Sequence, residues 1–173
     1  MLNMQIDTIK LKNMETKLNC KFGDDGVFVE MALALNEYQE QLPSISGVSF
    51  GVYSGDLEKI RKLVEKVDAK WCKYFTENTT IFCAFVNKEP VSFCIITPTA
   101  DSILCDDKLK IGGVACVGTV PEYRKRGLGL KMVDMATIYL KTLNCDIAYI
   151  HYTHLEKWYK KLGYKTVARF SIL

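Results

Sequence analysis

The stretch VPEYRKRGLG, residues 120–129, places three cations beside two glycines and leads directly into the apolar run LKMVDMATIYL. The residues concerned are Arg124, Lys125, Arg126, Gly127 and Gly129. The start of a helix exposes unpaired backbone N–H groups and the positive end of the helix dipole, and glycines let a ligand approach the backbone closely. This pattern predicts a site for a phosphate group.

Two well-known phosphate-binding loops do not fit this stretch. A Rossmann fingerprint requires a third glycine where Met132 stands, and a Walker loop requires GxxxxGK followed by serine or threonine. A solvated basic turn without any ligand also accounts for the three cations. The residues alone therefore leave a phosphate site and a bare basic turn open.

Length and composition predict one compact domain that folds without a metal or a disulfide. The chain has 173 residues, 49% of them hydrophobic, which is sufficient for a buried core. Lysine and arginine number 23 against 20 acidic residues, so the formal charge is +3 and any basic site must be local. This small excess argues against nucleic-acid binding as the main task, because that role requires a longer basic surface.

Cysteine usage and the lengths of the apolar runs predict a cellular setting. The seven cysteines form no CxxC pair, and the start MLNMQIDTIK lacks the build of a signal peptide. His151 and His154 are the only histidines, so no zinc site is expected. No apolar run reaches the roughly 20 residues of a membrane span. We therefore expect a cytoplasmic protein with free thiols, no metal and no membrane contact.

The first half of the chain alternates strand-like and helix-like segments. METKLNCKF and VFVEMALAL, joined by the turn GDDG, predict an N-terminal hairpin, and the polar stretch after it ends in a proline near residue 45. GVSFGVYSG suits a short strand, and GDLEKIRKLVEKV predicts a helix capped by Ser54 or Asp56. TIFCAFV and VSFCIITP predict two strands joined by the turn NKEP.

The second half continues this alternation. IGGVACVGTV predicts a strand whose glycines indicate a bulge or a close approach to the backbone, and residues 127–143 predict a helix. CDIAYI predicts a covered strand, HLEKWYKKLGY a short helix and KTVARFSIL a final strand. The predicted fold is α+β: a central mixed, mostly antiparallel sheet with helices on both faces and an extra N-terminal β-hairpin. The predicted division is an extension over residues 1–46 and a main domain over 47–173.

Two separated motifs give the chain a resemblance to a known family. VGTVPEYRKRGLG resembles the acyl-CoA-binding signature of the GNAT superfamily of N-acetyltransferases, in which a strand leads through a V-x-P-like turn into R-x-x-G-x-G and a helix. WYKKLGYK, further along the chain, is similar to the closing motif of that family, Y-x-K-L-G-F. The resemblance covers roughly residues 47–173 and implies a GNAT-like acyl-CoA N-acyltransferase fold.

The resemblance implies a binding place for acetyl-CoA as cosubstrate. The pantetheine arm would lie against the end of the glycine-rich strand, where backbone amides hold its amide groups and polarise the thioester carbonyl. The pyrophosphate would bind the backbone amides of residues 125–130, with the basic side chains around it. The implied cosubstrate-binding residues are Val117, Gly118, Thr119, Arg124, Lys125, Arg126, Gly127, Leu128, Gly129 and Leu130.

The resemblance also implies catalytic roles. Tyr159 matches the tyrosine that protonates the departing CoA thiolate, although an aromatic residue on this helix is often only part of a core. The attacking amine must lose a proton, and IGGVACVGTV has no carboxylate, so His151 is the best titratable candidate for the base. A lone histidine at the end of a strand is also often only hydrogen-bonded. We interpret Cys116 as a small core residue rather than an acyl carrier.

The implied activity is direct transfer of an acetyl group from acetyl-CoA to a primary amine of an unidentified small molecule or protein. A non-catalytic CoA-binding regulatory module is the alternative, and the missing strand carboxylate favours it. A nucleic-acid-binding domain built on RKR is a third hypothesis, which the charge balance opposes. We expect no nucleic-acid and no membrane partner, while a homodimer remains open.

Overall fold

The computed structural model describes residues 4–106 and 108–173, and the chain divides into two compact units. The first unit comprises the described residues up to Tyr38, Pro98–Gly113 and Lys141–Leu173. The second unit comprises Gln39–Thr97 and Val114–Leu140.

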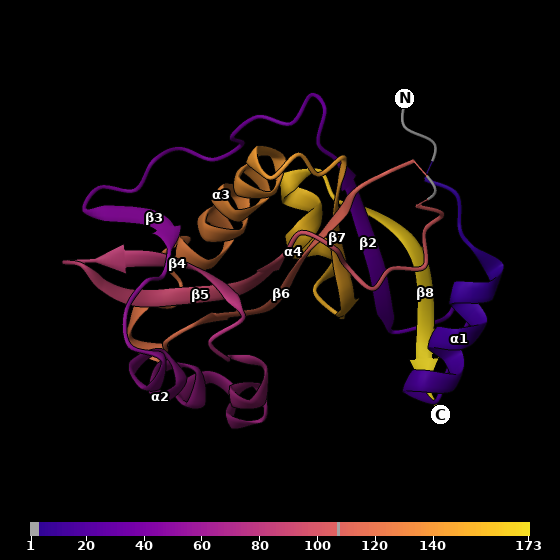
Figure 1. Ribbon diagram of the computed structural model, residues 1–173, viewed down its shortest axis with the longest axis horizontal. Coiled ribbons are helices and arrows are strands. Elements are labelled where there is room, and N and C mark those ends of the chain that lie inside the picture. Colours follow the sequence, from indigo (N-terminus) through magenta and orange to yellow (C-terminus); the bar gives the residue numbers. More distant parts are fainter. Residues whose placement is uncertain (1–3, 107) are drawn as a thin grey trace. The chain divides into compact units, whose positions relative to one another are not determined.

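The part of the chain that the structure describes contains four α-helices and eight strands, labelled in Figure 1. The helices are α1 (Thr8–Leu18), α2 (Leu57–Asp68), α3 (Leu128–Thr142) and α4 (Glu156–Tyr159). The strands are β1 (Cys20–Phe22), β2 (Phe28–Ala34), β3 (Val48–Val52), β4 (Thr80–Val86), β5 (Glu89–Thr97), β6 (Ile111–Thr119), β7 (Ile147–Thr153) and β8 (Lys165–Ile172).

The strands are hydrogen-bonded in the order β1-β8-β2-β7-β6-β5-β4-β3. β6 pairs with β7 in parallel, over Ile111–Gly113 and Ile147–Tyr149. The pairs β1 with β8, β2 with β8, β2 with β7, β3 with β4 and β4 with β5 are antiparallel. The sheet is therefore mixed and mostly antiparallel, as the sequence predicts.

In the second unit, helices cover both faces of the strands. Ile60 of α2 packs in a buried cluster with Ile81 and Cys83 of β4. Phe82 points to the other face, because side chains alternate along a strand, and its ring lies 5.4 Å from that of Tyr139 on α3. Figure 1 shows α2 and α3 on opposite sides of these strands. Within this unit the predicted placement of helices on both faces is confirmed.

A buried ionic network attaches the segment before β3 to α3. The fully buried Asp134 accepts hydrogen bonds from the N–H groups of Gln41 at 3.1 Å and Leu42 at 2.9 Å. Lys131, also buried, donates to Asp134 at 3.2 Å, to the Leu42 carbonyl at 2.6 Å and to the carboxylate of Glu40. Because both charges are removed from water, these partners replace their hydration.

The predicted N-terminal hairpin is wrong. Met14–Leu18, predicted as strand, form the second half of α1. Asp7 caps this helix by accepting a hydrogen bond from Ile9 N–H at 2.8 Å, and Asn19 ends it in the left-handed conformation, with φ of 49°. Met14 is its one buried side chain, so α1 has no apolar stripe that the sequence could reveal.

β1 and β2 do not pair with each other within residues 4–106 and 108–173. Instead β8 lies between them, so that Phe22 of β1 and Phe28 of β2 are both partners of Phe170. The turn GDDG therefore carries the chain across β8 rather than closing a hairpin.

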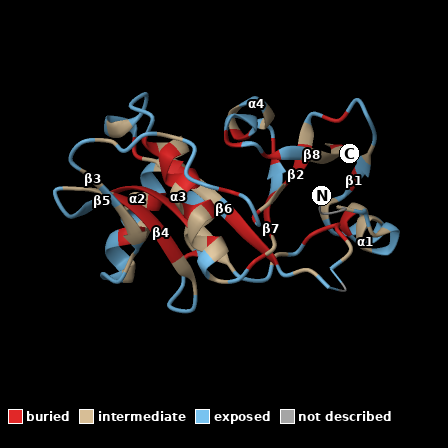
Figure 2. Ribbon diagram, turned by 90° about the horizontal axis from the view of Figure 1, so that it is seen from above, coloured by how far each residue is buried: buried red, intermediate tan, exposed pale blue. Residues whose placement is uncertain are grey.

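Strand β2 is the internal strand of the first unit. It pairs antiparallel with β7 on one side and with β8 on the other. A buried cluster behind these strands joins Met14 of α1, Ala32 of β2, Tyr149 of β7 and Leu104. Figure 2 shows buried residues along these strands and along α3. The end of β7, which carries His151, is thus set on a well-packed framework.

Candidate active site

The end of β6 is held by side chains of β5. Ser92 Oγ donates a hydrogen bond to the carbonyl of Gly118 at 2.8 Å and lies 2.8 Å from Thr119 Oγ1. A Cβ atom at Gly118 would lie 2.5 Å from the ring of Phe93. The glycines of this strand predict a close approach to the backbone, and at Gly118 the approaching group is the ring of Phe93. Val117, the preceding residue, is half-buried.

Strand β6 leaves the extended conformation at Cys116. Its φ of 49° lies in the left-handed region, which residues other than glycine rarely adopt. Cys116 packs against the buried cluster that includes Phe93, and burial raises the pKa of its thiol to about 11. The thiol is therefore protonated near pH 7 and a poor nucleophile, which argues against an acyl-carrier role for this partly buried cysteine.

Two of the three cations after β6 shape the turn in which they lie. Arg124 Nε donates to the carbonyl of Thr119 at 2.9 Å. Arg126 donates to the carbonyl of Glu122 at 3.0 Å, and its guanidinium lies 5.1 Å from the centre of the Tyr123 ring. Both arginines are exposed, and a guanidinium has five N–H donors, so each keeps donors for an anion.

Helix α3 begins with an open N-terminus. The carbonyl of Gly127 accepts the hydrogen bond of Lys131 N–H at 3.1 Å, so Gly127 is the N-cap and has no side chain to satisfy the first amides. Its φ is 75°, and no described atom lies within 4 Å of the position that a Cβ would take. The next amides, those of Leu128, Gly129 and Leu130, belong to the first helical turn and have no acceptor within the helix.

A phosphate-binding site at a helix N-terminus uses features of this kind. The helix has 15 residues, Gly127 at its start is exposed, and the neighbouring Lys125 is an exposed cation. Lys125 also has a positive φ, of 60°, so the whole turn bends tightly in front of the helix. The second unit brings together all ten residues predicted to bind the cosubstrate.

Tyr159 lies in the first unit, as the last residue of α4. Only 4% of its surface is exposed. Its ring is 4.9 Å from that of Trp158 and 6.0 Å from that of Tyr164, with edge-to-face geometry in both contacts. The aromatic body of Tyr159 is therefore part of a core, so a catalytic role would depend on its hydroxyl alone.

His151 lies near the end of β7, also in the first unit, and contacts a carboxylate. Its Nδ1 is 3.0 Å from both carboxylate oxygens of Glu30, a residue of β2 with no exposed surface. Sequence analysis missed Glu30, because it is separated from His151 by 121 positions. The feature of the sequence that could have indicated Glu30 is its position as the single acidic residue inside the apolar run VFVEMALAL.

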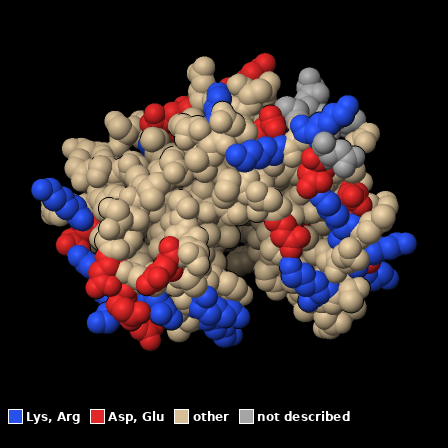
Figure 3. Space-filling model, viewed as in Figure 1, with Lys and Arg blue, Asp and Glu red and all other residues tan. Residues whose placement is uncertain are grey.

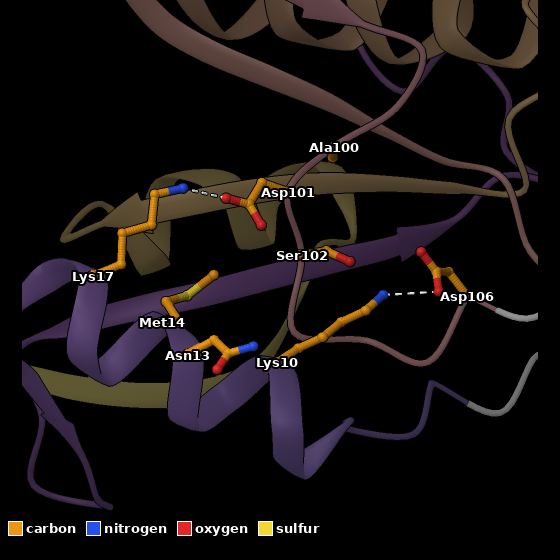
Figure 4. A pocket seen from close by; sticks show the side chains of 8 residues that line it. All are labelled: Lys10, Asn13, Met14, Lys17, Ala100, Asp101, Ser102 and Asp106. Atoms are coloured by element: carbon orange, nitrogen blue, oxygen red, sulfur yellow. Dashed lines mark hydrogen bonds and ion pairs between the residues drawn. The ribbon is translucent and has the colours of Figure 1, made fainter.

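A cavity of about 270 Å³ lies in the first unit between α1 and residues 100–106. Figure 4 shows its lining side chains, in which Lys17 pairs with Asp101 at 2.5 Å and Lys10 with Asp106 at 2.8 Å. These charges compensate one another, so the cavity offers no net charge to a phosphate. None of the twelve predicted site residues lines it.

One face of the molecule carries charges of both signs. On the face shown in Figure 3, basic and acidic side chains are interspersed. Residues 4–106 and 108–173 contain no group of three His, Cys, Asp or Glu side chains placed to hold a metal ion. In the same residues, no helix has the length and apolar character needed to cross a membrane.

Comparison with known proteins supplies the family. A sequence profile described as acetyltransferase (GNAT) domain matches residues 77–166, slightly more than half of the chain. No curated protein matches the sequence.

Solved structures share the fold at low sequence identity. A GCN5-related glucosamine N-acetyltransferase region of a fungal multi-domain GH3 β-N-acetylglucosaminidase superposes with a TM-score of 0.71 and 21% identity, covering 94% of this chain and 22% of that chain. A GCN5-related N-acetyltransferase from Kribbella flavida gives 0.62 and 16% identity, covering 92% of this chain and 61% of the other. One from Sphaerobacter thermophilus gives 0.62 and 14%, covering 95% and 55%.

This chain therefore spans less than two thirds of each of these solved chains. The likeness shows a common fold, and the matching profile shows the family. With a mixed, mostly antiparallel sheet and an open helix N-terminus after β6, the chain belongs to the GNAT acetyltransferase family.

Proposed function

We propose that this protein transfers the acetyl group of acetyl-CoA directly to a primary amine of a small molecule or of a protein. The observation that carries the proposal is the open N-terminus of α3 at Gly127, directly after β6, in a member of an acetyltransferase family. The first-turn amides and the exposed cations before them suit the pyrophosphate of CoA. This is the most specific anion site that the motif residues offer.

The binding residues have distinct tasks in this proposal. Amides of residues 125–130 donate hydrogen bonds to the pyrophosphate, and Lys125, Arg124 and Arg126 add positive charge around it. Backbone groups of Val117–Thr119 hold the amide groups of the pantetheine arm and polarise the thioester carbonyl. The bonds from Ser92 to this end of β6 keep that backbone fixed before the ligand arrives.

His151 and Tyr159 handle the protons. His151 accepts a proton from the ammonium group of the acceptor, and the free amine nitrogen then forms a bond to the thioester carbonyl carbon. As the carbon–sulfur bond breaks, the electron pair stays on sulfur, and the Tyr159 hydroxyl gives its proton to the thiolate. The nitrogen is cationic after the attack and loses its second proton as the amide forms, and a proton returns to Tyr159 through solvent. The products are the acetylated amine, CoA and the proton taken up by His151.

We propose that residues 47–173 carry the transferase and that residues 1–46 extend it. Strand β2 of this extension pairs on both sides with strands of the main region, so the two parts fold together. The extension therefore contributes to the framework of His151.

A CoA-binding module without catalysis is the second candidate, and the nearly complete burial of Tyr159 favours it. A panel of amines with acetyl-CoA, monitored by a thiol reagent, separates the two functions. Amine-dependent thiol release supports the transferase, whereas acetyl-CoA binding without such release, for every amine in the panel, would exclude it.

Tyr159→Phe is expected to lower kcat by roughly 100-fold, because it removes the acid while keeping the ring. A variant as fast as the wild type would remove Tyr159 from the chemistry.

Gly129→Glu tests the binding site. The substitution places a carboxylate in the first turn of α3, where it opposes an anion, so we expect acetyl-CoA binding to be lost in calorimetry while the circular dichroism is kept. Gly51→Glu is the control, because it adds a glutamate to the same unit outside the predicted site, and a Cβ at Gly51 meets no atom within 4 Å. Binding by Gly129→Glu equal to that of the control would contradict the assignment.

A further inference from the structure

The side chains of Glu30 on β2 and His151 on β7 form a close pair. The Glu30 carboxylate, fully buried, is 3.0 Å from His151 Nδ1 through each of its oxygens. Its Oε1 also accepts the N–H of Tyr152 at 3.1 Å. The His151 side chain is 35% exposed, so one edge of the imidazole is held by the protein while the ring remains accessible.

The backbone of β2 is irregular at Glu30 on both of its sides. Against β7, the pairing register shifts between Val29 and Met31, and against β8 it shifts between Glu30 and Met31. Such bulges redirect a side chain relative to a regular strand and occur often beside active sites. Opposite this irregularity, Tyr152 has a φ of 54°, which is a strained conformation for an aromatic residue. Local distortion on two strands thus accompanies the contact between the carboxylate and the imidazole.

An ionised carboxylate can only accept hydrogen bonds, and a buried one requires donors. The Tyr152 amide is one donor, and Tyr149 also hydrogen-bonds Glu30. His151 Nδ1 lies 3.0 Å from both carboxylate oxygens, where a lone pair on Nδ1 would be repelled, so Nδ1 carries the proton. A neutral imidazole with its proton on Nδ1 has its lone pair on Nε2, on the side of the ring away from Glu30. The tautomer that can act as a base is therefore the one that Glu30 selects.

Resting on the function proposed above, we propose that Glu30 is a positioning residue that holds the proton of His151 on Nδ1 and leaves Nε2 to accept the proton of the acceptor amine. The Nδ1 proton stays in place during the reaction, and Glu30 touches no substrate. Transfer of the amine proton to Nε2 creates an imidazolium, which the adjacent carboxylate stabilises. Strand β6 has no carboxylate that could act as the base for the amine. In this proposal the pair of Glu30 and His151 takes that role.

Titratable groups of the first unit that interact with the pair or with its neighbours include Glu15 of α1. Tyr149 and Tyr152 come from β7, Cys20 from β1 and Asp101 from the segment before β6. Burial and contact with Glu30 raise the pKa of Tyr149, and burial, with Glu15 and Glu30, raises the pKa of Cys20. Neither group changes its charge near pH 7, so His151 is the proton acceptor that these neighbours leave available.

The wild-type protein alone provides a first test. Nitrogen-15 NMR of labelled histidine distinguishes the two tautomers of His151, and His154→Gln assigns the signals by removing the other histidine. We expect the neutral form to carry its proton on Nδ1. A neutral His151 with its proton on Nε2 would overturn the proposal, because its Nε2 could not accept a proton.

Glu30→Gln is the perturbation that keeps the volume. The amide oxygen must replace Oε1 to satisfy the Tyr152 N–H, so the amide NH₂ is left facing His151 Nδ1. Nδ1 must then accept a hydrogen bond, and the proton moves to Nε2. We expect NMR to show this change and kcat to fall by roughly 100-fold, with KM for acetyl-CoA nearly unchanged.

A double-mutant cycle shows whether Glu30 acts through His151. In the background of His151→Gln, adding Glu30→Gln should cause no further loss in kcat, whereas a merely structural role gives additive losses. The deficit of Glu30→Gln should also shrink at high pH, where the amine is already neutral and needs no base. His154→Gln, an exposed histidine outside the pair, is the control and should keep the wild-type rate.

The outcomes separate this inference from the function on which it rests. An active wild type with an unaffected Glu30→Gln, or with additive losses in the cycle, overturns the role of Glu30 alone. A wild type that acetylates no amine overturns the proposed function and the catalytic part of this inference with it. If Glu30→Gln does not fold, as circular dichroism would show, the wild-type tautomer decides the assignment.

Discussion

Replacing Asp134 with alanine is expected to destabilise the second unit strongly. The carboxylate is fully buried and accepts hydrogen bonds from two backbone N–H groups and from Lys131. Removing one partner of a buried ion pair costs about 3–5 kcal/mol, because the remaining charge keeps its desolvation penalty. Since Gln41 is exposed and Leu42 half-buried, water can replace part of the lost bonds, and Lys131 keeps Glu40. We therefore expect the lower end, a loss of about 3 kcal/mol.

Each unit contains one tryptophan, which allows the effect to be measured locally. Trp71 lies in the second unit and Trp158 in the first. In a Trp158→Phe background, fluorescence during urea unfolding reports on the second unit alone. For a chain of this length, a loss of about 3 kcal/mol corresponds to a decrease of about 6–12 °C in Tm.

A second variant tests the reason rather than the size of the effect. Lys131→Met combined with Asp134→Leu removes both charges, so it should be more stable than Asp134→Ala. Glu89→Ala is the control, because the ion pair of Glu89 with Lys59 is exposed on both sides and should matter little. An Asp134→Ala protein within about 1 kcal/mol of the wild type, or a double variant less stable than it, would refute the argument.

Two further predictions concern individual ionisable groups. Hydrogen bonds from Arg169 and Lys160 lower the pKa of Glu156 from 4.5 to about 2, so its ionised form stabilises the folded state above the unfolded pKa. Glu156→Gln should thus be less stable than the wild type at pH 7. The difference in unfolding free energy between the two proteins should disappear as the pH falls from about 4.5 to about 2. A difference that persists at pH 2 would contradict the pairing of Glu156 with Arg169 and Lys160. Cys116, with a pKa of about 11, should be alkylated slowly by iodoacetamide at pH 7.5 in mass spectrometry; rapid labelling of the native protein would contradict its burial.

Elements that depend on neighbours in sequence were predictable. Asp56 accepts a hydrogen bond from Glu58 N–H at 2.8 Å, so α2 begins beside one of its two predicted caps. The turn between β4 and β5 lies at Asn87 and Lys88, both with positive φ, within the predicted NKEP. The glycine-rich start of α3 was equally readable, because a helix N-cap needs only its own few residues.

Features that depend on distant pairing were not predictable from one sequence. Glu30 contacts His151, which lies on β7, and this contact cannot be read from the sequence around Glu30. The GDDG turn does not close a hairpin, because β8 lies between β1 and β2. Gly118 was interpreted through a backbone approach whose partner, Phe93, is known only once β5 and β6 are packed. In each case the partner that decides the outcome comes from another part of the chain.

The internal position of β2 has a consequence for biosynthesis. At about 5–20 residues per second, β2 would leave the ribosome roughly ten seconds before β7 and β8, its two partners. During that interval both edges of an apolar strand are unpaired, which is a state that favours aggregation and chaperone binding. A recombinant fragment limited to residues 77–166 would lack β2 altogether and nearly all of β8. Expression of the recognisable family region therefore requires the strand that precedes it.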